Sequence, residues 1–312
     1  MLTYGRLSAA HKGDILFALR ATECLSSPAS LHACSQAASG GLMVQFENVF
    51  REERFYCNHF FRLLCEGLSD RPGVSGLSKV LGLLSLPKQS ADAIGTAEVY
   101  TEVACFRDVF FVEAAKDDFL EKLFDQLHPM LLAQYGSGVN NAQRPAQLRK
   151  RIGMLHPAKY RDRLKEPEFD KCDVLFYHEL GALFNAKPDF LILLPDHANW
   201  IEAKCSSAFS TSQIQRMRHI GALCATDLFA EYFGHRQPTI ALLGSELRHA
   251  KAQKIEGTRF ISWQQCAGIA ADVFPAGSND ITSRALAQVA AQRAHGAATK
   301  DLPWRANSSR VT

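Results

Sequence analysis

Two short apolar segments joined by a turn constrain the fold of this chain most strongly. Residues 190–194 (Phe-Leu-Ile-Leu-Leu) are apolar on both faces, a pattern that is typical of a strand in the centre of a sheet. The turn-forming residues 195–199 separate this segment from a second predicted strand, 200–205. The two strands are therefore expected to pair as a hairpin.

Helical patterns and short strand patterns surround the hairpin. Apolar residues recur at the three-and-four spacing of a buried helix face over 44–66, and the run Ser210-Thr211-Ser212 offers an N-cap for a helix running to about Phe233. Segment 173–177 is predicted as a strand, with a helix running to Phe184 as the alternative. The remaining predicted elements are helices over 9–25, 117–135 and 262–273 and strands over 108–113 and 238–243. The fold class that follows is a mixed α/β fold, with a central sheet flanked by helices.

Charged residues interrupt the second strand of the hairpin. Glu202 and Lys204 point to the same side of that strand because side chains alternate along a strand. If the hairpin pairs as predicted, Asp189 lies at the neighbouring end of the first strand. The carboxylates of Asp189 and Glu202 could then share a hard divalent cation, for which Mg²⁺ is the usual choice. Lys204 would lie beside the metal and stabilise charge on phosphate oxygens.

Pro188-Asp189 followed by Glu202-Ala203-Lys204 resembles the motif of the PD-(D/E)xK nuclease superfamily. The resemblance implies a restriction endonuclease-like core, built as helix, three-strand meander, helix and strand. It implies Mg²⁺, with Mn²⁺ as a possible substitute, held by Asp189 and Glu202, while Lys204 positions the attacking water. It also implies a DNA substrate in a restriction, phage-defence or repair system, and a possible homodimer.

Two further residues match roles that the superfamily gives to its helices. Glu53 lies in phase with the apolar stripe of the helix predicted over 44–66, and the resemblance makes it an additional acid towards the metal; Glu52 and Glu47 are the alternates. Gln213 matches the glutamine that follows the (Glu/Asp)-x-Lys strand, with Gln215 as second choice. Met217 stands where some members have a tyrosine, so the fuller form of that motif is absent.

The predicted organisation has three parts. Residues 1–43 form an N-terminal helical region, residues 44–275 form the nuclease domain, and residues 276–312 form a peripheral or disordered tail. The core of the nuclease domain is predicted at 44–66 and 170–273. Residues 67–169 would be a mostly helical, basic insertion.

The net charge of +3 is too small to indicate nucleic-acid binding by itself, but the basic residues are clustered. Cationic side chains concentrated on one segment can neutralise backbone phosphates. We therefore predict contacts to nucleic acid from one cluster, with a solvated helix face as the alternative. Its members are Arg149, Lys150, Arg151, Lys159, Arg161 and Arg163.

The remaining features exclude other classes of protein. The nine cysteines have no paired metal-ligand spacing, and they are interpreted as reduced, buried thiols. Trp263 is expected to pack at the core edge rather than to stack on bases. No apolar run is long enough for a membrane helix and no signal peptide is recognisable, which favours the cytoplasm. The alternative function is a catalytically inactive binder of nucleic acid or of a protein partner on the same fold.

Overall fold

The computed structural model describes residues 53–152, 156–159, 169–205, 209–246 and 257–291 of the 312-residue chain. The predicted helix 9–25, the first part of the helix predicted over 44–66, and the tail beyond residue 291 lie outside these ranges. Within them, helices and a five-stranded mixed sheet confirm the mixed α/β fold class. The order of the strands in the sheet is β1-β2-β3-β4-β5.

The chain divides into two compact units, and the boundaries between them fall inside β3 (His197–Ala203) and β4 (Gln237–Gly244). Unit 1 contains the described residues from Ala97 to Ile201 and from Phe209 to Ile240. Unit 2 contains those from Glu53 to Thr96, from Glu202 to Cys205, and from Ala241 to Ala291.

Unit 1 builds its core from helices and the first strands of the sheet. Aromatic side chains dominate this core: Phe106 stacks on Phe229, and Phe110 lies edge-on to Phe184. The strand residues that join it alternate along β2 (Phe190–Leu193), as expected for one face of a strand. The helices of the unit are α4 (Cys105–Val112), α5 (Lys116–Tyr135), α6 (Pro145–Ile152), α8 (Lys171–Asn185), α9 (Thr211–Cys224) and α10 (Ala230–Phe233).

The predicted hairpin is confirmed. β2 pairs antiparallel with β3, and Phe190 lies opposite Ile201 while Leu193 lies opposite Ala198. The connection is tighter than predicted, because β3 already begins at His197 and the His197 carbonyl accepts the Leu194 N–H at 2.8 Å. On the other side of β2 lies β1 (Glu98–Thr101), which also runs antiparallel to it.

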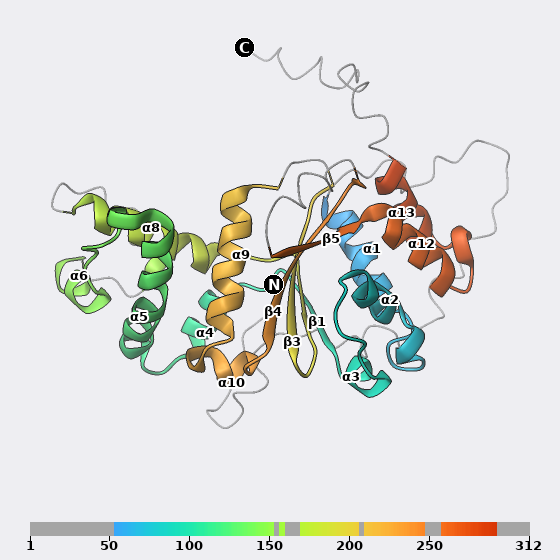
Figure 1. Cartoon of the computed structure of the whole chain (residues 1–312), viewed down its shortest axis with the longest axis horizontal. Helices are drawn as coiled ribbons and strands as arrows, with labels where there is room; N and C mark the ends of the chain where they lie inside the picture. Colours follow the sequence, from blue (N-terminus) through green and yellow to red (C-terminus); the bar gives the residue numbers. More distant parts are fainter. Residues whose placement is uncertain (1–52, 153–155, 160–168, 206–208, 247–256, 292–312) are drawn as a thin grey trace, which may run out of the picture. The chain divides into compact units, whose positions relative to one another are not determined.

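Unit 2 is a cluster of helices with the ends of the sheet strands. α1 (Glu53–Cys65) packs against α2 (Gly76–Leu83) and α13 (Ile281–Ala291), and α12 (Trp263–Val273) packs against α2 and α13 (Figure 1). The short α3 (Ala91–Gly95) and β5 (Thr258–Ser262) belong to the same unit. An ion pair between Arg62 and Asp280, 3.1 Å apart, joins α1 to the start of α13.

One glycine sets how closely α1 and α2 approach each other. A Cβ atom added to Gly76 would lie 1.8 Å from the Leu63 carbonyl oxygen, and that oxygen belongs to the backbone. The Gly76 N–H also donates to the Glu66 carbonyl at 2.9 Å. Only a residue without a Cβ permits this contact, so Gly76 fixes α2 against the helix that carries Glu53.

Three predicted elements need correction. Residues 108–112 belong to helix α4, with Glu113 as its C-cap, and not to a strand, because Cys105, Phe106, Val109 and Phe110 form one buried helix face that a six-residue window does not reveal. The helix alternative is correct for 173–177. Helix α8 begins where the Asp170 carboxylate accepts the Asp173 N–H at 2.8 Å, which is an N-cap that the strand prediction overlooked.

The third correction concerns the helix predicted from Ser210 to Phe233, which is interrupted. α9 ends at Cys224, where the Thr226 hydroxyl donates to the Leu223 carbonyl at 2.6 Å, and a 3₁₀ turn over Asp227–Phe229 precedes α10. Strands β1 and β5 were not predicted, since four or five residues give too short an alternation to recognise.

The seven described cysteines are free thiols, and Cys105, Cys205, Cys224 and Cys266 are buried. Burial disfavours the charged thiolate, and it raises the pKa of the partly buried Cys65 to about 11. None of the helices in the described part of the chain combines the length and the apolar character needed to span a bilayer.

Candidate functional site

Two ion pairs in unit 2 bring together three of the predicted site residues. The Lys204 ammonium lies 2.5 Å from Glu202 Oε1 and 3.2 Å from Glu53 Oε1. Glu202 lies on β3 and precedes Lys204, the residue just after that strand, by two residues, whereas Glu53 is 151 residues from Lys204 in the sequence. The predicted grouping of Glu53 with the Glu202–Lys204 pair is therefore present in the structure.

Hydrogen bonds of the backbone fix the positions of Lys204 and of the residue that follows it. The Lys204 N–H donates to the Leu243 carbonyl of β4 at 2.8 Å, which continues the sheet pairing beyond the last residue of β3. The next residue contacts the helix directly, because the Cys205 N–H donates to Glu53 Oε2 at 3.2 Å. One oxygen of the Glu53 carboxylate thus binds the ammonium and the other binds the backbone. Glu53 is the first residue of α1 in the described part of the chain.

Because Glu202 and Lys204 are largely buried, each of these charged side chains requires the other as its counter-charge. Glu202 is 3% exposed, and the Lys204 side chain is 13% exposed. A buried carboxylate without compensation is costly, so the ammonium has a clear role as its counter-charge. The Glu53 side chain is more open, at 34% exposure, so one edge of the group faces solvent. Two carboxylates and one ammonium leave one net negative charge.

Trp263 holds the backbone of Lys204 in place, a role that the sequence did not predict. Its indole N–H donates to the Lys204 carbonyl at 3.1 Å, and its ring lies edge-on to Phe60 of α1. The Ser262 hydroxyl accepts the Gln265 N–H while the Gln265 side chain accepts the Ser262 N–H, and this capping box places Trp263 in the first turn of α12. The capping box is visible in the sequence, but the acceptor of the indole N–H is not. Trp263 is fully buried, deeper than the core-edge position predicted for it.

We expect the replacement Trp263→Phe to destabilise the protein by about 1–3 kcal/mol more than Trp200→Phe does, because it leaves the Lys204 carbonyl without its donor. Trp200 is a matched control. It is also fully buried, and its indole N–H has no acceptor among the described residues. Chemical denaturation of both variants gives the difference in the free energy of unfolding. Equal losses would contradict a contribution from the Trp263 hydrogen bond.

Asp189 lies at the corresponding end of β2 in unit 1. It directly precedes Phe190, whose partner in the register is Ile201, the residue before Glu202. Asp189 thus lies just before the first residue of β2, and Glu202 follows Ile201 within β3. The Asp189 carbonyl accepts the N–H of Glu102, a residue whose φ of +52° is unusual for a side chain other than glycine. Asp189 itself is partly exposed and follows the buried Pro188.

The oxygen donors fit magnesium better than they fit a softer metal. Magnesium is commonly held by one or two carboxylates and keeps several of its waters, and Glu53 and Glu202 offer hard oxygen ligands of this kind. A fuller protein cage is absent from the described residues, where no three His, Cys, Asp or Glu side chains are grouped to hold a metal ion. Any metal here would therefore keep part of its water shell.

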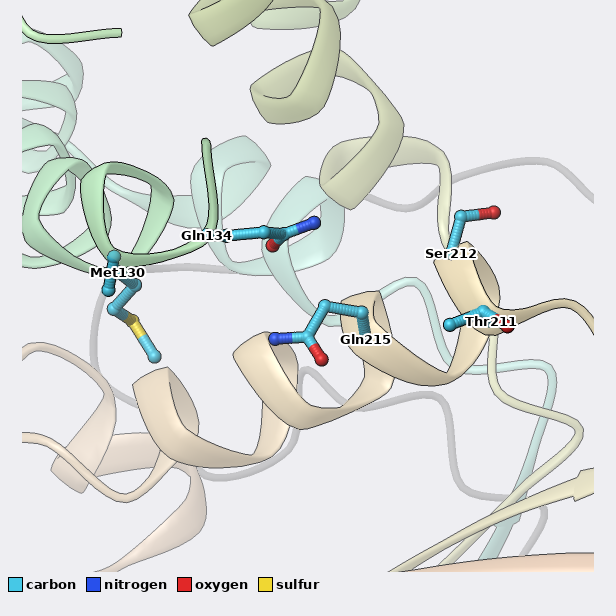
Figure 2. A pocket seen from close by; sticks show the side chains of 6 residues that line it. Met130, Gln134, Thr211, Ser212 and Gln215 are labelled. Atoms are coloured by element: carbon cyan, nitrogen blue, oxygen red, sulfur yellow. The ribbon is translucent and has the colours of Figure 1, made fainter. Parts of the chain in front are cut away.

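Gln213 lies in unit 1 and is partly buried in the first turn of α9. Its alternate, Gln215, lines a pocket of about 530 Å³ whose walls come from α5 and α9. The side chains of Gln134 and Gln215 extend into the space between these helices (Figure 2). The Gln215 amide is 3.1 Å from Nε2 of His219, a buried side chain whose pKa is lowered by desolvation, while the Glu179 carboxylate acts in the opposite direction. The role of Gln213 stays a prediction.

Part of the predicted basic cluster takes part in intramolecular ion pairs. Arg149 pairs with Asp117, and the neighbouring Arg144 lies 3.1 Å from Glu121 and 2.6 Å from Asp125. Lys150 and Lys159 are exposed. The Arg151 side chain and the residues Arg161 and Arg163 lie outside the described part of the structure. Contacts to nucleic acid from this cluster stay a prediction, with Lys150 and Lys159 as its most accessible described members.

No protein-family model matches this chain, and no curated protein and no solved structure is significantly similar to it.

Proposed function

We propose that this chain is a magnesium-dependent nuclease that hydrolyses phosphodiester bonds in DNA. One observation carries the proposal: the Lys204 ammonium is held by the carboxylates of Glu202 and Glu53, from a strand and a helix that are distant in the sequence. A buried acid and a lysine two residues apart at the end of a strand, with a second acid from a helix, are part of the set that the sequence motif predicts.

The order of the elements also supports a restriction endonuclease-like core. Helix α1 precedes β1, β2 and β3, which are antiparallel neighbours in the sheet, and α9 and β4 come after β3. This order resembles the helix, three strands, helix and strand of the superfamily, except that α2 and α3 separate α1 from β1 and that four helices, α4, α5, α6 and α8, separate β1 from β2. The strand β1 lies within residues 67–169, the part of the chain predicted as an insertion.

Each residue has a distinct task in this proposal. Glu202 and Asp189 would hold the metal, with Glu53 supporting it; manganese would serve as a substitute. A bound magnesium ion would supply a Lewis acid next to the phosphate oxygens. Lys204 would orient the attacking water and stabilise negative charge on the phosphate.

Gln213 would orient the water or a phosphate oxygen. The exposed Lys150 and Lys159 would contact the nucleic-acid backbone, and the biological setting would be restriction, phage defence or repair.

A second candidate is a nucleic-acid or partner binder on the same fold that performs no hydrolysis. It is favoured by the absence, among the described residues, of a group of three metal-binding side chains. In that case the ion pairs of Lys204 would serve the fold alone. Salt-sensitive binding of DNA without cleavage under any divalent metal would identify this candidate.

A cleavage assay separates the two candidates. Purified full-length chain is incubated with linear, circular and single-stranded DNA and with RNA, in the presence of magnesium, manganese or a chelator. The nuclease proposal expects products with either metal and none with the chelator. Cleavage of circular DNA would indicate an endonuclease. Intact substrates under every metal condition, with binding retained, would favour the second candidate.

A further inference from the structure

Lys204 forms its two ion pairs with the same carboxylates that would hold the metal. Its ammonium lies 2.5 Å from a Glu202 oxygen and 3.2 Å from a Glu53 oxygen, and the side chain is largely shielded from water. At these distances, and at reduced dielectric, each pair is stronger than an exposed surface pair. Any cation that binds Glu53 and Glu202 must therefore compete with the ammonium.

We propose that Lys204 is an exchangeable counter-cation of Glu53 and Glu202, and that a divalent cation binds this pair by displacing the ammonium from at least one carboxylate. The proposal rests on the proposed nuclease function and adds a regulatory step to it. Magnesium requires oxygen ligands at about 2.0–2.1 Å. An ammonium in contact with the same oxygens would lie close to the doubly charged metal ion, and the repulsion between like charges disfavours that arrangement.

The geometry allows the displacement to occur without unfolding. The backbone of Lys204 is held at both ends, by the Leu243 carbonyl and by the Trp263 indole, so its Cα stays in place. The ammonium itself is at the end of a flexible four-carbon stem, which can move independently of the backbone. Glu53 also keeps a second contact, to the Cys205 N–H, so its carboxylate stays oriented when the ammonium leaves.

This exchange would couple metal binding to catalysis. While both carboxylates bind Lys204, its charge is compensated and little of it is available to a phosphate. Displacement would free the ammonium next to the site where the phosphate has to bind. The metal would thereby prepare the lysine for its catalytic task, and the two carboxylates would not be left without a counter-charge at any stage.

The test compares metal affinity between variants by isothermal titration with magnesium and with manganese. Lys204→Met removes the competing charge, and we expect it to bind the metal at least about tenfold more tightly than the wild type, since a tenfold change corresponds to about 1.4 kcal/mol. Lys204→Arg keeps the charge and should stay within about twofold of the wild type. Lys79→Met is a second control, because Lys79 pairs with Asp272 on the surface of the same unit.

Thermal unfolding provides a readout that is independent of activity. Lys204→Met should be less stable than the wild type in chelator, and magnesium should raise its melting temperature more than that of the wild type. If Lys204→Met does not fold, Lys204→Gln serves in its place. Equal metal affinity in the wild type and the neutral variants would overturn the exchange while leaving the nuclease proposal standing. A failure of all variants to bind either metal would overturn both.

Discussion

Replacing Lys204 by glutamine is expected to lower the magnesium-dependent cleavage rate by about 10²- to 10³-fold, the loss that follows removal of a single electrostatic group from an active site. Glutamine keeps part of the length of the side chain, and its amide still has two N–H donors. It cannot supply the positive charge that the developing charge on the phosphate requires. The expected change therefore lies in the maximal rate rather than in substrate affinity.

The matched control is Lys79→Gln. Lys79 is also in unit 2 and also pairs with a carboxylate, at 3.1 Å from Asp272, but its partner is 67% exposed and the pair belongs to the surface. Surface pairs contribute little to stability, so this variant should cleave as the wild type does. Circular dichroism and melting curves show whether both variants fold. Full cleavage by folded Lys204→Gln would exclude the catalytic role of Lys204.

The replacement Gly76→Ala is expected to destabilise the protein by about 3 kcal/mol, at the upper end of the usual range for overpacking. The added Cβ would lie 1.8 Å from the Leu63 carbonyl oxygen and 2.9 Å from its carbon, and backbone atoms cannot move aside as a flexible side chain can. α2 must then shift away from α1. Because α1 carries Glu53, the metal-dependent cleavage should fall together with stability.

Gly82 provides the opposite result on the same helix. A Cβ added at Gly82 meets nothing within 4 Å, and the residue is exposed. Gly82→Ala should therefore stabilise α2 by about 0.5–1 kcal/mol, since alanine is the better helix former. Guanidinium unfolding of both variants measures the two effects. Similar unfolding midpoints for both would show that the close approach of the two helices is not a constraint.

Local patterns in the sequence were sufficient for features whose determinants lie within a few residues of one another. The apolar run at 190–194 and the turn after it predicted the β2–β3 hairpin, and the two-residue spacing placed Glu202 and Lys204 together. The helices predicted over 117–135 and 262–273 correspond to α5 and α12. The prediction for the short segment 108–113 was wrong because the segment spans less than two helical turns, so its helical periodicity cannot be recognised.

The sequence by itself therefore determined the mixed α/β class, the hairpin and the acid–lysine pair on its second strand, because each depends on neighbours along the chain. Only the tertiary structure decided which distant groups form hydrogen bonds and ion pairs with Lys204. Glu53 contacts Lys204 across 151 residues and Trp263 contacts it across 59, and both contacts require the packing of separate helices in unit 2. The physical reason is that a buried charge selects its partner by distance in space, which spacing along the chain does not encode.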